Sequence, residues 1–270
     1  MAQKFRQSIA EVDIHNEDIG VRVNFLSGSR RAVDRRTYDR LVPTHPEPTR
    51  ITLIRHGESN VTVQRIIGGH RTCSGLSDLG RRQSEQLAQR FSEREALGAD
   101  VLISSDFARA VETAKIIAPA IGLADIERWP DFGEHDPGPE IDGMRFDEYV
   151  SRFGTPDWSG DPHVEIFPGG ETTATFHARV RAAVGRLIDT HAGAHVAIAC
   201  HGGVVDAVFR KALDLPATGG FALHTLNTSL TEFVSPDEPG AHWRLIRYND
   251  TAHLAGLPAA TARSNVTSQP

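Results

Sequence analysis

The sequence predicts an α/β protein in which a mainly parallel sheet lies between two layers of helices. Apolar runs at residues 51–54, 101–104 and 196–199 lack the alternation of half-exposed strands, as is typical of strands buried on both faces of a parallel sheet. Segments with helical spacing of apolar residues separate these runs. This alternation of strand and helix favours a three-layer α/β/α sandwich.

Three amphipathic helices are predicted between and after these strands. Ser77 is a suitable N-cap, with Asp78 in the first turn, for a helix whose apolar positions extend to Phe91. Apolar residues recur at helical spacing over 110–121 and again over 176–188. Each helix thus has one apolar face that can cover the sheet.

Weaker strand signals complete the sheet. Residues 125–128 are predicted to form a short strand, and 229–234 and 242–248 a final pair around a turn at 235–240. The turn is indicated by its two prolines and its glycine.

Three parts of the chain are distinguished by composition. We expect a main domain over residues 50–257, an N-terminal extension over 1–49 that is peripheral or partly disordered, and a C-terminal tail over 258–270. The extension is rich in arginine and ends in a proline-rich stretch at 43–48. Two interpretations remain open: a basic arm for a partner or polyanion, or a solvated tail or upstream sequence included by start-site choice.

Charge and cysteine content exclude several classes of protein. The chain has 29 Lys+Arg against 35 Asp+Glu, a net charge of −6, which argues against bulk attraction to nucleic acid or to an anionic membrane. With Cys73 and Cys200 as its two cysteines, it has no disulfide framework, which suits a reducing compartment. No apolar stretch is long enough to span a membrane. We therefore expect a cytoplasmic protein with no nucleic-acid or membrane partner.

Candidate functional residues follow the predicted strands. Ligands of open α/β sheets bind outside the carboxyl ends of the strands, so the segments that directly follow these strands are expected to hold the site residues. They carry two arginines, two histidines and a carboxylate: Arg55, His56, Arg109, Glu134 and His201.

This residue set favours phosphate chemistry. Arginine forks match phosphate oxygens, and glycine after each histidine, at Gly57 and Gly202, lets a helix N-terminus approach an anion. A neutral imidazole can accept a phosphoryl group, and nearby arginines keep it neutral. A carboxylate can protonate the departing alkoxide. Because cationic side chains supply the charge stabilisation, no cofactor or metal is expected.

The same segments resemble the histidine phosphatase superfamily, in its phosphoglycerate mutase-like branch, branch 1. The resemblance covers roughly residues 50–248, with the motifs in the family's order. They are Arg55-His56-Gly57-Glu58-Ser59, Leu76-Ser77-Asp78-Leu79-Gly80-Arg81-Arg82-Gln83, Ser104-Ser105 with Arg109, Glu112-Thr113-Ala114, Glu134, Pro168-Gly169-Gly170-Glu171 and His201-Gly202-Gly203.

The resemblance implies a role for each matching residue. His56 is the expected nucleophile that becomes phosphohistidine, and Glu134 the proton donor and later the base that activates water. Arg55, Arg109 and His201 are expected to hold the phosphoryl group. Thr62 and Gly202 join them as expected phosphate-binding residues.

Several carboxylates could serve as the proton donor. Glu127, Glu140 and Asp136 lie in the same neighbourhood as Glu134. The stretch at 132–138 fits the family pattern of an apolar residue, any residue, Glu, and then Gly four residues further on. This pattern favours Glu134.

Two departures from the family favour hydrolysis over isomerisation. Mutases usually carry Asn six residues after the nucleophile, where this chain has Thr62, and an Arg and a Tyr after the acid, where it has His135 and Asp136. Asp136 would repel the carboxylate of phosphoglycerate. We therefore expect a metal-independent phosphomonoester hydrolase that acts on a small phosphorylated metabolite. The alternatives are a phosphoglycerate mutase and a non-catalytic phospho-ligand binding scaffold.

Further expectations concern the surroundings of the site. Selectivity is expected to come from residues 132–171, with Trp158 and Phe167 as lid aromatics, and from the loop at 66–75. Asn227 and Ser229 are expected to brace the loop of His201. A homodimer is common in the resembled family and is kept as an expectation, because the residues alone do not determine the oligomeric state.

Overall fold

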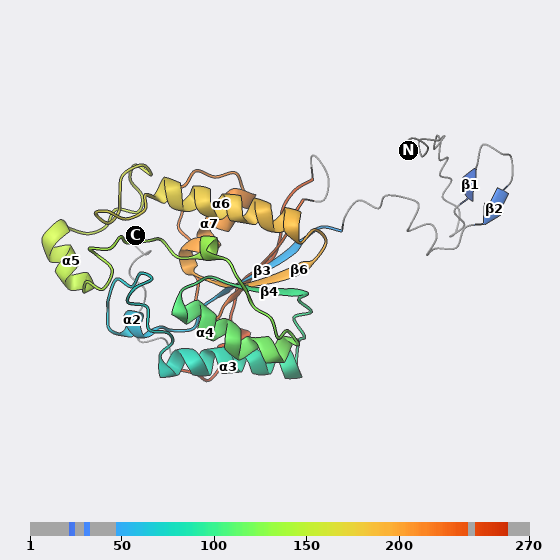
Figure 1. Cartoon of the computed structure of the whole chain (residues 1–270), viewed down its shortest axis with the longest axis horizontal. Coiled ribbons are helices and arrows are strands. Elements are labelled where there is room, and N and C mark those ends of the chain that lie inside the picture. Colours follow the sequence, from blue (N-terminus) through green and yellow to red (C-terminus); the bar gives the residue numbers. More distant parts are fainter. Residues whose placement is uncertain (1–21, 25–29, 33–46, 237–240, 259–270) are drawn as a thin grey trace, which may run out of the picture. The chain divides into compact units, whose positions relative to one another are not determined.

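The structure is a computed structural model that describes residues 22–24, 30–32, 47–236 and 241–258 (Figure 1). The chain divides into two compact units, residues 1–46 and 47–270. In the first, β1 (Arg22–Asn24) pairs antiparallel with β2 (Arg30–Ala32). The arginine-rich and proline-rich stretches lie largely outside the described residues, as does the tail from residue 259, so the predicted extension and tail remain predictions.

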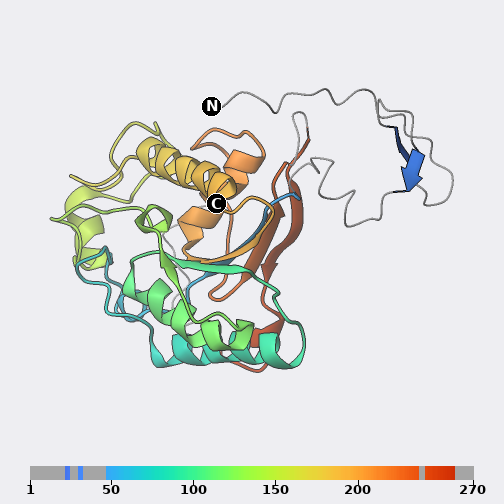
Figure 2. The same ribbon diagram turned by 45° about the vertical axis from the view of Figure 1, so that its right-hand side comes forward.

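The second unit contains a six-stranded sheet with the order β5-β4-β6-β3-β7-β8. The strands are β3 (Arg50–Arg55), β4 (Val101–Ser104), β5 (Glu127–Arg128), β6 (His195–Cys200), β7 (Leu230–Val234) and β8 (Arg244–Asp250). The neighbouring strands from β5 to β3 pair in parallel. β7 pairs antiparallel with β3, and β8 pairs antiparallel with β7. The last strands, drawn in red, form one edge of the sheet (Figure 2). The predicted mainly parallel α/β sheet is confirmed.

Helices cover both faces of the sheet (Figure 1). One layer contains α3 (Asp78–Glu93) and α4 (Ala108–Ile117), and the other contains α6 (Thr173–Thr190) and α7 (Gly202–Ala212). Each layer has its own buried apolar cluster, one joining β3 and β6 to α6 and α7, the other joining them to α3 and α4. The predicted three-layer sandwich therefore rests on two cores that share the central strands.

Helix boundaries follow local chemistry. Ser77 caps α3 as predicted, because its Oγ accepts a hydrogen bond from the Gly80 N–H at 3.0 Å. The helix predicted over 110–121 ends as an α-helix at Ile117 and continues as the 3₁₀ helix η1 (Ala118–Ile121). Pro119 lacks the N–H that an α-helix would use at that point.

Weakly patterned segments were predicted less accurately. The strand expected at 125–128 is reduced to β5, and the last strand is shifted from 242–248 to 244–250. Part of the turn predicted at 235–240 lies outside the described residues. The helices α2 (Asn60–Val63) and α5 (Phe146–Phe153) were not predicted, because both are too short to show a helical period. The 3₁₀ turns η2 (Pro130–Phe132) and η3 (Ala252–Leu254) complete the elements.

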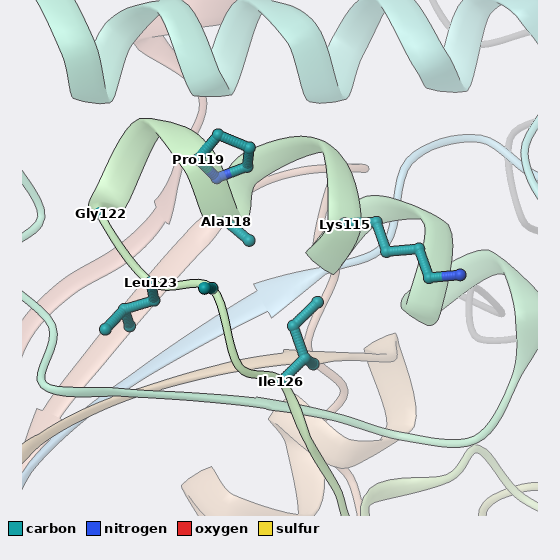
Figure 3. A pocket seen from close by; sticks show the side chains of 7 residues that line it. Lys115, Ala118, Pro119, Gly122, Leu123 and Ile126 are labelled. Carbon is teal, nitrogen blue, oxygen red and sulfur yellow. The ribbon is translucent and has the colours of Figure 1, made fainter.

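Two surface properties can be stated for the described residues. No helix among them is long and apolar enough to cross a membrane. A shallow, mostly apolar pocket of about 400 Å³ lies beside η1, between Lys115 and Ile126 (Figure 3). It contains none of the predicted site residues.

Candidate active site

The carboxyl ends of β3 and β6 place the two predicted histidines side by side. Because the strands are parallel neighbours in register, Arg55 pairs with Cys200, and the His56 N–H donates to the Cys200 carbonyl at 2.9 Å. His56 and His201 therefore leave the sheet together. Their ring centroids lie 5.1 Å apart with an interplanar angle of 62°.

Arg109 links the two imidazoles. It lies in the first turn of α4, directly after β4, and its Nε donates to His56 Nε2 at 3.0 Å and to His201 Nδ1 at 3.3 Å. Its Nη1 donates to the Gly68 carbonyl and to Cys73 Sγ, each at 3.3 Å. The side chain is thus held on several sides, with its guanidinium at the histidine pair.

His56 has the properties of a neutral nucleophile. Its Nδ1 donates to the Gly57 carbonyl at 2.6 Å, and since a carbonyl only accepts, Nδ1 carries the proton and Nε2 keeps its lone pair. Burial, together with the charges of Arg109 and Arg55, holds the pKa of His56 well below its usual range. The ring is therefore uncharged at neutral pH, with Nε2 directed at Arg109.

His201 is oriented by a residue that the sequence analysis did not assign to the site. Its Nδ1 accepts from Arg109, so Nε2 carries the proton and donates to Ser105 Oγ at 2.8 Å. Burial and the nearby Arg109 lower its pKa well below the usual value. Ser105 lies in a motif that pointed to the family, and this motif was the one sequence signal for its role.

Arg55 contributes a second, partly buried cation near the start of α7. Its Nη1 donates to the Thr225 carbonyl, whereas its buried Nε has no hydrogen-bond partner among the described residues. Burial lowers the pKa of Arg55, and the Glu134 carboxylate opposes this effect. A Cβ added to Gly202 would lie 3.7 Å from Arg55 Nε, so the guanidinium and the helix N-terminus face the same space. That combination favours an anion.

Glu134 is the carboxylate that reaches this helix start. Its Oε2 accepts from the Gly203 N–H at 3.2 Å, and its Oε1 accepts from the His135 N–H at 3.1 Å. A Cβ at Gly203 would approach Glu134 Oε1 to 2.3 Å, so glycine is needed there for the carboxylate to fit.

The competing acids are engaged elsewhere or lie at the surface. Glu127 accepts from the Trp129 indole at 3.0 Å, and Asp136 accepts from the Gly138 N–H at 2.9 Å. Glu140 is exposed in a turn. Of the four carboxylates considered, Glu134 is the one bonded to the N-terminus of the helix that follows His201.

Two expectations about neighbouring residues differ from the structure. The Asn227 amide donates to the His56 carbonyl at 2.9 Å, so it braces the loop of His56 and not that of His201. Ser229 Oγ is buried without a partner among the described residues, and its carbonyl accepts from the Arg55 N–H at 3.3 Å. Both residues lie just before β7, and the antiparallel pairing of β7 with β3 brings this loop to the end of β3.

Thr62 lies apart from the histidine contacts. Its Oγ1 is 2.8 Å from Ser59 Oγ at the start of α2. Its role as a phosphate-binding residue therefore remains a prediction.

The two segments expected to govern selectivity are fastened to each other. The Asp142 carboxylate accepts from the N–H groups of Gly69 and Arg71 at 2.9 and 2.8 Å, and also from Thr72 Oγ1. These hydrogen bonds lower the pKa of Asp142. Since Gly68 in the same loop contacts Arg109, the 132–171 segment is connected to the arginine through this loop.

The predicted lid aromatics surround the residue after the acid. The His135 ring lies 5.1 Å from Trp158, 5.9 Å from Phe167 and 5.8 Å from Phe176, measured between centroids. Burial lowers the pKa of His135, so its ring is neutral at pH 7. Trp158 and Phe167 thus pack into a small apolar cluster that also contains Tyr149.

Comparison with known proteins identifies the family. A family model described as histidine phosphatase superfamily (branch 1) matches residues 51–251. The chain belongs to this superfamily. Its members act on phosphate esters, and the matched region includes every residue that the sequence analysis placed at the site.

Individual relatives carry different functional names. The chain is 30% identical over 208 residues to phosphoglycerate mutase-like protein 4 of Arabidopsis thaliana, which covers 76% of this chain and 86% of that protein. A solved structure titled mycobacterial hydrolase 1 has a TM-score of 0.64 and 25% identity, covering 75% of this chain and 99% of its own. The mycobacterial glucosyl-3-phosphoglycerate phosphatase has a TM-score of 0.62, 24% identity and the same coverage, and this likeness concerns the fold alone.

Proposed function

We propose that the protein is a metal-independent phosphomonoester hydrolase that acts on a small phosphorylated metabolite through a phosphohistidine on His56. The observation that carries this proposal is a neutral His56 whose unprotonated Nε2 lies 3.0 Å from the Arg109 Nε. A nucleophile and a cation are thus positioned at one point, as phosphoryl transfer requires.

In the first step the phosphoryl group moves from the substrate to His56. Arg55, Arg109 and the Gly202 N–H at the start of α7 hold the phosphate oxygens, and the Arg109 N–H exchanges its bond with Nε2 for one with a phosphoryl oxygen. Nε2 attacks phosphorus, and the bond from phosphorus to the ester oxygen breaks. Glu134 donates its proton to the departing alkoxide.

The second step releases inorganic phosphate. The Glu134 carboxylate takes a proton from water, and the oxygen of that water attacks phosphorus as the bond to Nε2 breaks. His201, fixed by Ser105, remains against the phosphoryl group throughout. The second step thus returns to Glu134 the proton that the first step gave to the alkoxide. Thr62 is retained in this proposal as a phosphate contact.

The surroundings of Glu134 support hydrolysis over mutase chemistry. A mutase that acts on phosphoglycerate needs cations to hold the substrate carboxylate. Here the two residues after the acid are His135, buried and neutral among three aromatic rings, and Asp136, an exposed anion. This difference weighs against transferring the mutase name of the Arabidopsis relative to this chain.

The test is release of phosphate from an aryl phosphate in the presence of a chelator. Wild type is expected to hydrolyse the ester, His56→Ala is expected to lose this activity, and His195→Ala serves as a buried-histidine control at the opposite end of β6. Efficient interconversion of 3- and 2-phosphoglycerate would favour the mutase. Phosphate binding without turnover would favour the non-catalytic scaffold. A screen of phosphorylated metabolites would then narrow the substrate.

A further inference from the structure

The loop at residues 224–229 contacts the backbone of Arg55 and His56 and the side chain of Arg55 in the proposed phosphate site. The Thr225 carbonyl accepts from the Arg55 guanidinium, and the Asn227 amide donates to the His56 carbonyl at 2.9 Å. The Thr228 N–H donates to the Arg55 carbonyl at 2.8 Å. This loop is therefore one of the segments that hold Arg55 and His56 in place, together with β6.

A segment near the C-terminus holds this loop in turn. Its contacts come from Tyr248 and Asn249 in β8 and from His253 in η3. The Tyr248 hydroxyl donates to the His224 carbonyl at 2.6 Å, and Asn249 Oδ1 accepts from the Leu226 N–H at 2.7 Å.

The third contact is a buried histidine–threonine pair. Thr228 Oγ1 donates to the Asn227 carbonyl at 2.8 Å, so its bond with His253 Nε2 at 3.0 Å is one in which the ring donates. His253 is 7% exposed, and burial lowers its pKa to about 4, which leaves the ring neutral at pH 7 with its proton on Nε2. The hydroxyl of Thr228 thus connects His253 to the residue that bonds the His56 carbonyl.

Positive backbone angles on each side indicate that the contacts between the loop and the C-terminal segment hold backbone conformations that non-glycine residues seldom adopt. Thr228 has φ +54° and Asn249 has φ +51°. Non-glycine residues are uncommon in the left-handed region and persist there when their surroundings fix them. For Thr228, which is fully buried, those surroundings are Arg55 and His56 on one side and His253 on the other.

We propose that Tyr248, Asn249 and His253 form a C-terminal brace of positioning residues for the reaction at His56, through the 224–229 loop. This inference rests on the proposed function. None of the three bonds His56, Arg55 or Arg109 in the structure, so the brace acts through Thr228, Leu226 and His224. A misplacement of about 1 Å at a reacting centre can cost about 10²-fold in rate, so a brace two contacts away has measurable leverage.

A matched pair of histidines separates positioning from simple stability. His195 is 6% exposed and lies 2.8 Å from Thr52 Oγ1. It therefore forms a second buried histidine–threonine pair. His195 is the first residue of β6 and lies at the end of the sheet opposite His56 and His201. The experiment compares His253→Leu with His195→Leu, and each with its glutamine variant, because Gln can replace the donor at Nε2.

We expect His253→Leu to lower kcat for an aryl phosphate by about 10-fold or more and to raise the inhibition constant of inorganic phosphate. His253→Gln should recover most of this loss. His195→Leu should lower the melting temperature to a similar extent and leave kcat within about twofold. Tyr248→Phe removes a single oxygen and should show a smaller loss in the same direction, which keeps the test valid should His253→Leu fold poorly.

Amide hydrogen exchange supplies a readout that does not depend on catalysis. In His253→Leu the amides of Arg55, His56 and Thr228, which bond Ser229, Cys200 and Arg55, should exchange faster than in His195→Leu. Equal kcat and equal exchange in the two leucine variants would overturn the brace. If wild type neither hydrolyses the ester nor binds phosphate, the proposed function fails, and the exchange comparison still decides whether the loop is held from the C-terminal side.

Discussion

Arg50 and Arg55 begin and end the same strand, and the protein uses them in opposite ways. Arg50 pairs with the fully buried carboxylate of Glu232, which also forms an ion pair with Arg247 at 3.0 Å. Arg55 forms no ion pair with the described residues and bonds the Thr225 carbonyl instead. Arg50 links β3 to the neighbouring strand β7 through an ion pair. Arg55 leaves its charge available to a ligand.

The same contrast extends to the two regions around these arginines. Towards the β7–β8 edge of the sheet, the ion pairs of Glu232 continue into a network in which Arg247 pairs with Glu95 at 2.8 Å and Arg90 pairs with Asp250 at 2.7 Å. At the carboxyl end, Arg55 and Arg109 face two neutral histidines. An unpaired charge held away from water is costly, so we expect an anion bound by Arg55 and Arg109 to stabilise this end of the sheet. That local excess exists within a chain of net charge −6.

The sharpest test of this contrast is Arg109→Gln. It removes a cation that no carboxylate of the described residues pairs with, so kcat/KM for an aryl phosphate should fall by about 10³-fold. The free energy of unfolding should stay the same or rise, because a buried like charge beside Arg55 is removed. Steady-state kinetics and urea unfolding measure both. A large loss of stability would show that Arg109 is a structural residue.

Substitution of the proposed acid should depend on the leaving group. Glu134→Gln keeps an oxygen that can accept from the Gly203 N–H but has no carboxyl proton to transfer. Hydrolysis of an alkyl phosphate should slow by about 10²-fold or more, whereas an aryl phosphate with an acidic phenol should be affected far less in its first step. Rates for a series of leaving groups test this. An equal loss across the series would assign Glu134 a role in binding.

The ion-paired edge should respond in the opposite manner. Arg247→Gln leaves the buried Glu232 carboxylate with one cation fewer, and we expect a loss of about 1–3 kcal/mol in the free energy of unfolding. Activity should fall far less than in Arg109→Gln, since the ion pairs of Arg247 involve no residue of the site and reach the brace only through Asp250. Urea unfolding monitored by circular dichroism measures the loss. A drop in turnover with unchanged stability would erase the distinction between the two regions.

The pH profile gives a smaller effect with a defined sign. Burial and the charges of Arg109 and Arg55 lower the pKa of His56, so its neutral form persists below pH 6.5, and kcat/KM should not fall on acidification to that point. Removing one positive charge raises the pKa of His56 towards its usual value. Arg55→Gln should therefore move the acidic limb of kcat/KM to higher pH, whereas Arg50→Gln should leave it in place. Identical shifts would contradict the assignment.

Local sequence patterns predicted most of the strands and helices and the main site residues. Contacts between residues distant in sequence were missed. The buried strands, the Ser77 cap and the residues after each strand are local patterns, and they located His56, Arg109, Glu134 and His201 together. The brace depends on the pairing of β7 with β8. The sequence predicts this pair of strands but not the register between them, and β8 begins at residue 244, two residues later than predicted.

The partner of Asn227 was missed for a related reason. A side-chain amide at the end of a loop carries no periodic signal, and only the antiparallel pairing of β3 with β7 shows that His56 is its neighbour. Ser105 and Cys73 likewise gain their roles from contact with His201 and Arg109, across 96 and 36 residues of sequence.

The central claim is that the unpaired cations at the end of β3 hold a phosphoryl group while it is bonded to His56. Rapid mixing with a ³²P-labelled phosphomonoester, quenching in alkali and peptide mapping test it directly, because phosphohistidine survives alkali and decays in acid. We predict alkali-stable label on the peptide that contains His56 in wild type, and none in His56→Ala. Label on another residue, or turnover that continues in His56→Ala, would contradict the account.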